Sequence, residues 1–185
     1  MKKRLVSMLL ALAMCMGLAV PAVAVDVNSS STVASELSVS ANEIDMSMPY
    51  HYSKTFLENG QEVTIGVRYE PAAQTRSGSK SDPASEGVWT SYYNSPILSM
   101  SYKYDLEKSG SHWKVSNARD HRYSAIGYST SNPSLKIARS ISTASFPAEI
   151  NASVQYTLIT DLLFTSTGVV NTTVSDDGIV TVSWN

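Results

Sequence analysis

The sequence contains very little cysteine. Its single cysteine, Cys15, lies within an apolar run near the N-terminus. The rest of the chain therefore cannot form a disulfide framework, and it offers no thiolate for a metal site or for nucleophilic catalysis. A domain built from the remaining residues must be held together by its hydrophobic core and its backbone hydrogen bonds.

Histidine and catalytic motifs are also scarce. The three histidines, His51, His112 and His121, do not have the spacing of a zinc protease, and no serine occurs in a nucleophile elbow. The densest charge cluster, residues 119–122, includes Asp120 next to His121, but neighbours on a strand point to opposite faces and are poorly placed to pair. The sequence therefore predicts that the protein is not an enzyme and needs no cofactor.

One short acidic motif lies near the C-terminus. Asp176-Asp177-Gly178 contains two possible calcium ligands, but it is also ordinary turn chemistry and lacks the further oxygen ligands that the ion requires. We therefore predict no metal site.

The content of charged residues is low as well. Only 16% of the residues are charged, and loss of Lys2, Lys3 and Arg4 with a signal sequence would take the net charge from −2 to −5. Nucleic acids and anionic membrane surfaces attract basic proteins, so neither is expected as a partner.

The N-terminus has the features of a secretory signal. Residues 1–4 are basic at three positions, residues 5–20 are apolar, and Ala22-Val23-Ala24 supplies the small residues that signal peptidase requires. The apolar run is at the short end for a membrane span and is followed by Pro21. We therefore expect a secreted, extracellular protein with no membrane anchor after cleavage.

The chain beyond the signal divides into two parts. Residues 25–48 are rich in Ser, Val, Asn and Asp without a clear period, which predicts a flexible leader, although Leu37, Val39 and Ala41 alternate and can add an edge strand. Residues 49–185 are expected to form a single domain. Within it, residues 71–87 form a polar loop that is too long for a plain connection.

Three hairpins are expected within that domain. Asn59-Gly60 forms a type I′ turn, and Asp176-Asp177-Gly178 forms a three-residue loop with glycine in the left-handed position. A third turn lies at residues 108–111. Side-chain matching predicts the cross-strand pairs Phe56–Val63, Tyr52–Val67, Tyr50–Tyr69, Val174–Val180, Thr172–Val182, Val170–Trp184, Leu106–Trp113, Tyr104–Val115, Asp105–Lys114 and Glu107–His112.

The remaining segments also favour strands. Residues 87–94, 123–128, 135–141 and 150–158 have strand patterns, and Ser131-Asn132-Pro133 is expected to be a turn. About 8–10 short strands without a convincing long helix predict an all-β fold, an antiparallel β-sandwich or a partly open barrel.

Aromatic residues supply the candidate binding site. On the strand at residues 88–93, Trp89, Ser91 and Tyr93 share one face, and Val88, Thr90 and Tyr92 share the other. If the smaller set packs inside, Trp89 and Tyr93 remain outside, about 13 Å apart, and can stack on two neighbouring sugar rings. The alternative is that Trp89 belongs to the core, because tryptophan is highly buried on average.

Two resemblances accompany these patterns. The runs Gly87–Tyr92, Leu98–Tyr102, Trp113–Arg119 and Phe146–Ile150 resemble small secreted proteins of Gram-positive, often gut, bacteria, which are grouped as a domain of unknown function. That resemblance implies no activity. The segment Val88–Asn94 is similar to part of a cysteine-free bacteriocin family of much shorter β-sandwich proteins.

Three classes of function remain. The sequence favours a non-catalytic extracellular binding module whose partner is a cell-surface or host glycan, or a protein. A secreted bacteriocin-like antagonist or inhibitor is the alternative, and a hydrolase fits least, because no catalytic set of residues is apparent.

The signal sequence yields the first testable prediction. Because Ala22 and Ala24 occupy the positions that the peptidase reads, the secreted protein is expected to begin at Val25. Intact-mass measurement on protein from culture supernatant checks this, and a mass that retains residues 1–24 would contradict it.

Overall fold

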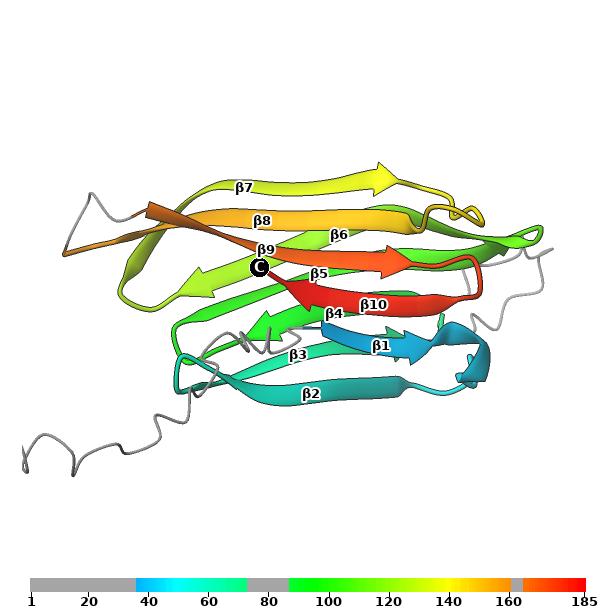
Figure 1. Cartoon of the computed structure of the whole chain (residues 1–185), viewed down its shortest axis with the longest axis horizontal. Helices are drawn as coiled ribbons and strands as arrows, with labels where there is room; N and C mark the ends of the chain where they lie inside the picture. Colours follow the sequence, from blue (N-terminus) through cyan, green and yellow to red (C-terminus); the bar gives the residue numbers. More distant parts are fainter. Residues whose placement is uncertain (1–35, 73–86, 161–164) are drawn as a thin grey trace, which may run out of the picture. The chain divides into compact units, whose positions relative to one another are not determined.

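Period-two alternation gives the described part of this chain ten strands, and the strands form two stacked sheets (Figure 1). The structure is a computed structural model that describes residues 36–72, 87–160 and 165–185. Within these residues, two antiparallel five-stranded sheets face each other and do not close into a barrel. The predicted all-β antiparallel sandwich is therefore confirmed.

The two sheets are named A and B here. Sheet A has the order β1 (Glu36–Ser40), β10 (Ile179–Trp184), β9 (Thr165–Val174), β8 (Ala148–Leu158) and β7 (Tyr128–Arg139). Sheet B has the order β2 (Tyr50–Glu58), β3 (Gln61–Glu70), β4 (Val88–Asn94), β5 (Leu98–Ser109) and β6 (His112–Ala125). A short 3-10 turn, η1 (Ala41–Glu43), follows β1. Among the described residues no helix is long and apolar enough to cross a membrane.

Two of the three predicted hairpins have the predicted register. The β2–β3 pairs Phe56–Val63, Tyr52–Val67 and Tyr50–Tyr69 are present, and so are the β9–β10 pairs Val174–Val180, Thr172–Val182 and Val170–Trp184. The backbone angles of the two turns explain why these registers could be predicted. Asn59 and Gly60 have φ of 51° and 78°, as a type I′ turn requires, and Gly178 has φ of 82°.

The third hairpin is shifted by two residues from the prediction. The turn is the two-residue Gly110-Ser111, so Leu106 lies opposite Val115 and Glu107 opposite Lys114. The Lys114 ammonium lies 2.7 Å from a Glu107 carboxylate oxygen, and this ion pair replaces the predicted pair of Lys114 with Asp105. A shift of two residues leaves every side chain on its predicted face, which is why the burial pattern alone could not detect it.

The second half of the chain also differs from prediction at one turn. Ser131-Asn132-Pro133 does not turn the chain, because β7 runs through it from Tyr128 to Arg139 with a register shift. Asn132 has φ of 49°, so its left-handed backbone forms a bulge instead of a hairpin. Similarly, β6 is one strand with two irregularities, at which Asn117 and Asp120 have positive φ.

The predicted leader needs correction too. Its residues 36–40 form β1, which pairs with β10 at the edge of sheet A, as the brief alternation there allowed. Leu37 and Ala41 are buried, so this segment belongs to the folded unit. The signal sequence, residues 25–35 and most of the loop at 71–87 lie outside the described residues.

The core between the sheets contains a buried chain of hydroxyl groups. Tyr102 of β5 donates to Thr172 of β9, Thr172 donates to Ser91 of β4 at 2.8 Å, and Ser91 contacts the Tyr104 hydroxyl at 3.4 Å. All four residues are fully buried. Burial also raises the pKa values of Tyr102 and Tyr104 well above the usual range, which keeps both phenols neutral. Thr172 therefore ties sheet A to sheet B by hydrogen bonds within an otherwise apolar core.

This network predicts an asymmetric effect of threonine substitutions on β9. Thr172→Val keeps the shape of the side chain but leaves two buried hydroxyls without their partner, so it should cost about 1–3 kcal/mol of unfolding free energy. Thr173→Val, on the half-exposed opposite face, should change stability by less than about 0.5 kcal/mol. Urea unfolding measures both, and equal stabilities for the two variants would contradict the proposed role of Thr172.

Candidate functional site

Trp89 and Tyr93, the predicted sugar platform, are not at the surface. They are 0% and 4% exposed, so the predicted outward orientation is wrong and the alternative, that Trp89 is a core residue, is correct. The Trp89 ring packs against Tyr69 at a centroid distance of 5.2 Å. Tyr93 stacks on Trp184 of the facing sheet, with centroids 3.7 Å apart and planes 17° apart.

The reason for this orientation lies in the neighbouring strands. In the sheet register, Trp89 is opposite Tyr69 and Tyr104, and Tyr93 is opposite Ile65 and Met100, all of them buried. Residues directly opposite one another share a face, so β4 must turn the same set inward. Burial raises the pKa of Tyr93 to about 12.

The outer face of sheet B is consequently lined by polar side chains in rows that run across the strands. The register gives the rows Thr55–Thr64–Asn94–Ser99–Ser124, Ser53–Gly66–Tyr92–Ser101–Arg122 and His51–Arg68–Thr90–Lys103–Arg119. Serine and threonine hydroxyls within the first row hydrogen-bond to one another at 2.8–2.9 Å. This face presents many small hydroxyl groups and only one tyrosine in its three rows.

Tyr92 reaches over its neighbour on β3 because that neighbour is glycine. A Cβ atom on Gly66 would lie 2.3 Å from the Tyr92 ring, which no real contact allows, so the ring occupies the place of the missing side chain. Its hydroxyl is 2.7 Å from Nε2 of His51 on the edge strand β2. The hydroxyl end of the ring therefore covers Gly66, and the side chain stays partly exposed at the outer face of the sheet.

A groove runs over this surface. Its larger part has a volume of about 670 Å³ and is lined by residues of all five strands, Tyr92 and His51 among them. A smaller hollow of about 260 Å³ continues it toward Lys103 and Asp120. Both hollows are lined by Arg68, Thr90, Ser101 and Arg122, so the two arginines stand where the hollows meet.

The charge of the groove is uneven along its length. The larger hollow has Arg68, Arg122 and His51 in its lining and no acidic residue among the described ones. Acidic residues occur toward the other end, where Asp120 lies 3.3 Å from Lys103 and Asp105 lies 2.8 Å from Arg119. The cations at that end are thus neutralised.

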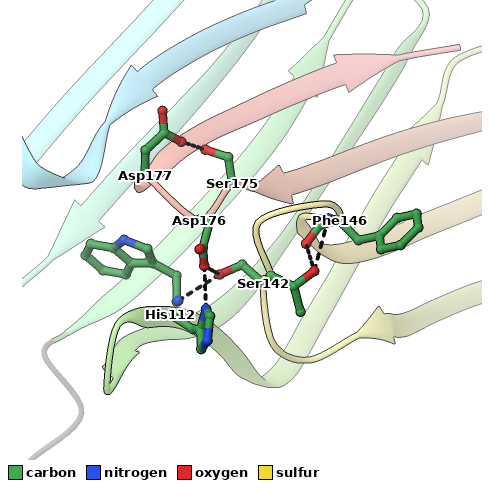
Figure 2. Close-up of polar contacts among 8 residues, drawn as sticks. His112, Ser142, Phe146, Ser175, Asp176 and Asp177 are labelled. Carbon is green, nitrogen blue, oxygen red and sulfur yellow. Dashed lines mark hydrogen bonds and ion pairs between the residues drawn. The ribbon is translucent and has the colours of Figure 1, made fainter.

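A second polar cluster, shown in Figure 2, joins His112, Asp176 and Ser142. Nδ1 of His112 is 2.7 Å from one Asp176 carboxylate oxygen, and Ser142 donates to the same oxygen at 2.8 Å. The Trp113 backbone N–H donates to the Ser142 hydroxyl at 2.8 Å. His112 therefore pairs with Asp176 from the distant β9–β10 turn and not with Glu107 as predicted.

This cluster has the residue types of a catalytic triad but not its arrangement. In a triad, histidine lies between the acid and the nucleophile, whereas here the carboxylate lies between histidine and serine. Ser142 is also fully buried and so cannot reach a substrate. The three residues form a structural hydrogen-bonded cluster that links the β5–β6 turn, the segment after β7 and the β9–β10 turn.

The other sequence candidates are likewise separate. Asp120 pairs with Lys103, whereas His121 lies beside Tyr123 with ring centroids 5.2 Å apart, and burial lowers its pKa. Asp177 accepts a hydrogen bond from Ser175 within its own turn. No cluster of three or more potential metal ligands occurs among the described residues.

Comparison with known proteins adds no functional information. The chain matches no known family model, and no curated protein is similar to it in sequence. A crystal structure of a hypothetical protein from Listeria monocytogenes is similar in structure, with a TM-score of 0.42 and 17% sequence identity. The match covers 73% of this chain and 95% of that protein. The resemblance to secreted families of unknown function and to bacteriocins stays a prediction.

The hydrogen-bonded cluster of His112, Asp176 and Ser142 predicts that the stability of the fold depends on pH. Hydrogen bonds from His112 and Ser142 hold the pKa of Asp176 below its usual value of 3.8, so the carboxylate stabilises the fold above that pH. Its contribution is lost as the pH falls through the lowered pKa.

Asp176→Asn should therefore melt at a lower temperature than the native protein at pH 5 to 7, and the difference should narrow as the pH falls below about 3.8. Melting curves of both proteins between pH 2 and pH 7 measure this. A difference that stays constant down to pH 2 would show that the charge of Asp176 does not stabilise the fold.

Proposed function

We propose that this protein is a secreted, non-catalytic glycan-binding module and that the groove on the outer face of sheet B is its binding site. The observation that carries the proposal is the Tyr92 ring, whose hydroxyl end lies over Gly66 in the lining of a groove. A flat, fixed aromatic ring suits the apolar face of a sugar ring, and little entropy is lost because the ring is already held in place.

The polar rows beside Tyr92 support the same proposal. A saccharide presents several hydroxyl groups to its binding site, and each needs a hydrogen-bond partner when water is displaced. Serine, threonine and asparagine side chains of the groove offer both donors and acceptors, and Thr64, Thr90, Asn94, Ser99, Ser101 and Ser124 all line it.

The composition of the groove favours a glycan over a protein partner. The central part of a protein–protein interface is usually apolar, with several aromatic anchors. Here most of the lining of the larger hollow is polar, with Tyr92 and Tyr123 as its two tyrosines and Met100 as its one aliphatic residue. The N-terminal signal pattern supports an extracellular location, where glycans are abundant.

The proposal predicts that Tyr92 dominates binding. Tyr92→Ala should weaken affinity for the best saccharide on a glycan array by about tenfold or more, because about 1.4 kcal/mol of stacking is lost. Tyr92→Phe keeps the ring and loses only the hydrogen bond to His51, so its effect should be a few-fold. Isothermal titration measures both affinities.

Two further variants make this test specific. Gly66→Ala places a methyl group where the Tyr92 ring lies, so it should weaken binding although it removes no ligand contact. Tyr52→Ala removes an exposed tyrosine from the same sheet, outside the groove lining, and should bind as the native protein does. If the protein binds no saccharide on a broad array, or if Tyr92→Ala binds unchanged, the proposal is wrong.

A further inference from the structure

Two arginines in the groove lack an acidic partner. Arg68 and Arg122 form no ion pair with any acid among the described residues, whereas the nearby Lys103 and Arg119 are each paired with an aspartate. A guanidinium that faces a groove without a counter-charge is available to a ligand.

Their positions face each other across the floor of the groove. Arg68 lies opposite Thr90 on β3 and β4, and Arg122 lies opposite Ser101 on β6 and β5. The three gaps between β3 and β6 span about 14 Å. Thr90 on β4 and Ser101 on β5, which line both hollows together with the arginines, are short. The floor is therefore low at Thr90 and Ser101, with a long cationic side chain on each flank.

The charges around Arg68 and Arg122 leave this part of the groove positive. The larger hollow contributes no acid, and of the two acids that line the smaller hollow, Asp120 is already 3.3 Å from Lys103. The other acid, Glu70, is two residues beyond Arg68 on β3, opposite Val88 at the end of the β3–β4 ladder, and among the described residues it forms no ion pair with either arginine. Because both arginines line both hollows, a chain ligand that occupies the whole groove must pass between them.

Resting on the proposed function, we infer that the groove binds a saccharide carrying an oxyanion, a carboxylate or a sulfate, and that Arg68 and Arg122 bind this group. A guanidinium presents two parallel N–H donors that match a carboxylate or sulfate in geometry and charge. Tyr92 lies in the cross-strand row next to that of Arg68 and Thr90, so the same ligand can stack one ring on it and place an anionic substituent between the arginines.

The experiment compares matched pairs of oligosaccharides. One pair is a uronate oligosaccharide and its carboxyl-reduced counterpart, and the other is a sulfated oligosaccharide and its desulfated counterpart. At least one anionic member should bind about tenfold or more tighter than its neutral counterpart, and the pair that shows the difference identifies the oxyanion. Added salt should weaken that preference.

Substitutions then test the two arginines. Arg68→Gln and Arg122→Gln should each weaken binding of the anionic member by about tenfold to a hundredfold, as loss of a charge-assisted hydrogen bond does, and leave the neutral member within about twofold. Lys136→Gln makes the same change of charge at an exposed position of β7 and should bind both members as the native protein does. Melting temperatures verify that all variants are folded.

The outcomes separate this inference from the proposed function. If neutral members bind as tightly as anionic ones in a manner sensitive to Tyr92→Ala, the groove is a glycan site and the anionic preference is wrong. If Lys136→Gln weakens binding as much as Arg68→Gln, the attraction is a general charge effect and the inference is also wrong. If no saccharide binds, the proposed function fails and the inference fails with it.

Discussion

The arrangement of this sandwich depends on the chain of hydroxyl groups between its sheets. Tyr102, Thr172, Ser91 and Tyr104 are all fully buried, and unpaired hydroxyls there would each cost more than a hydrogen bond returns. The network is satisfied only when Thr172 of sheet A lies over Ser91 of sheet B. Apolar contacts tolerate sliding of one sheet over the other, whereas these directional bonds do not.

This network and the pairing of β4 with its neighbours require the same face of sheet B to meet solvent, and that face is where a ligand can bind. With Ser91 directed inward, Trp89 and Tyr93 must follow it into the core, and Thr90 and Tyr92 must face outward. Tyr92 then lies on Gly66, and the small side chains beside it leave a groove. The packing that buries Trp89 and Tyr93, the predicted site, therefore also places Tyr92 in the groove on the outer face.

Local turn chemistry explains how much of the fold could be predicted from the sequence. Asn59-Gly60 sets the β2–β3 register because both residues have the positive φ that a two-residue type I′ turn requires. At Asp176-Asp177-Gly178 the positive φ of Gly178 fits a three-residue loop, and the match of Val174 with Val180 selected that loop over a two-residue one. The turn at Gly110 allowed more than one loop length, and the side-chain pattern accepted a register two residues away. Bulges such as the one at Asn132 resemble turns in sequence, since both use left-handed residues.

The candidate site could not be predicted for a related reason. The faces of β4 are ambiguous in isolation, since each carries at least one large aromatic residue, and only the neighbours decide between them. The β2–β3 hairpin identifies Val67 and Tyr69 as one face of β3, and alternation in β5 marks Tyr102 and Tyr104 as its apolar face. Pairing β4 between these strands places Trp89 in the row of Tyr69 and Tyr104 and turns it inward. Pairing β4 with β3 requires the register across residues 71–87. This loop is too long for its length alone to fix the pairing, so the sheet had to be assembled before the binding face could be identified.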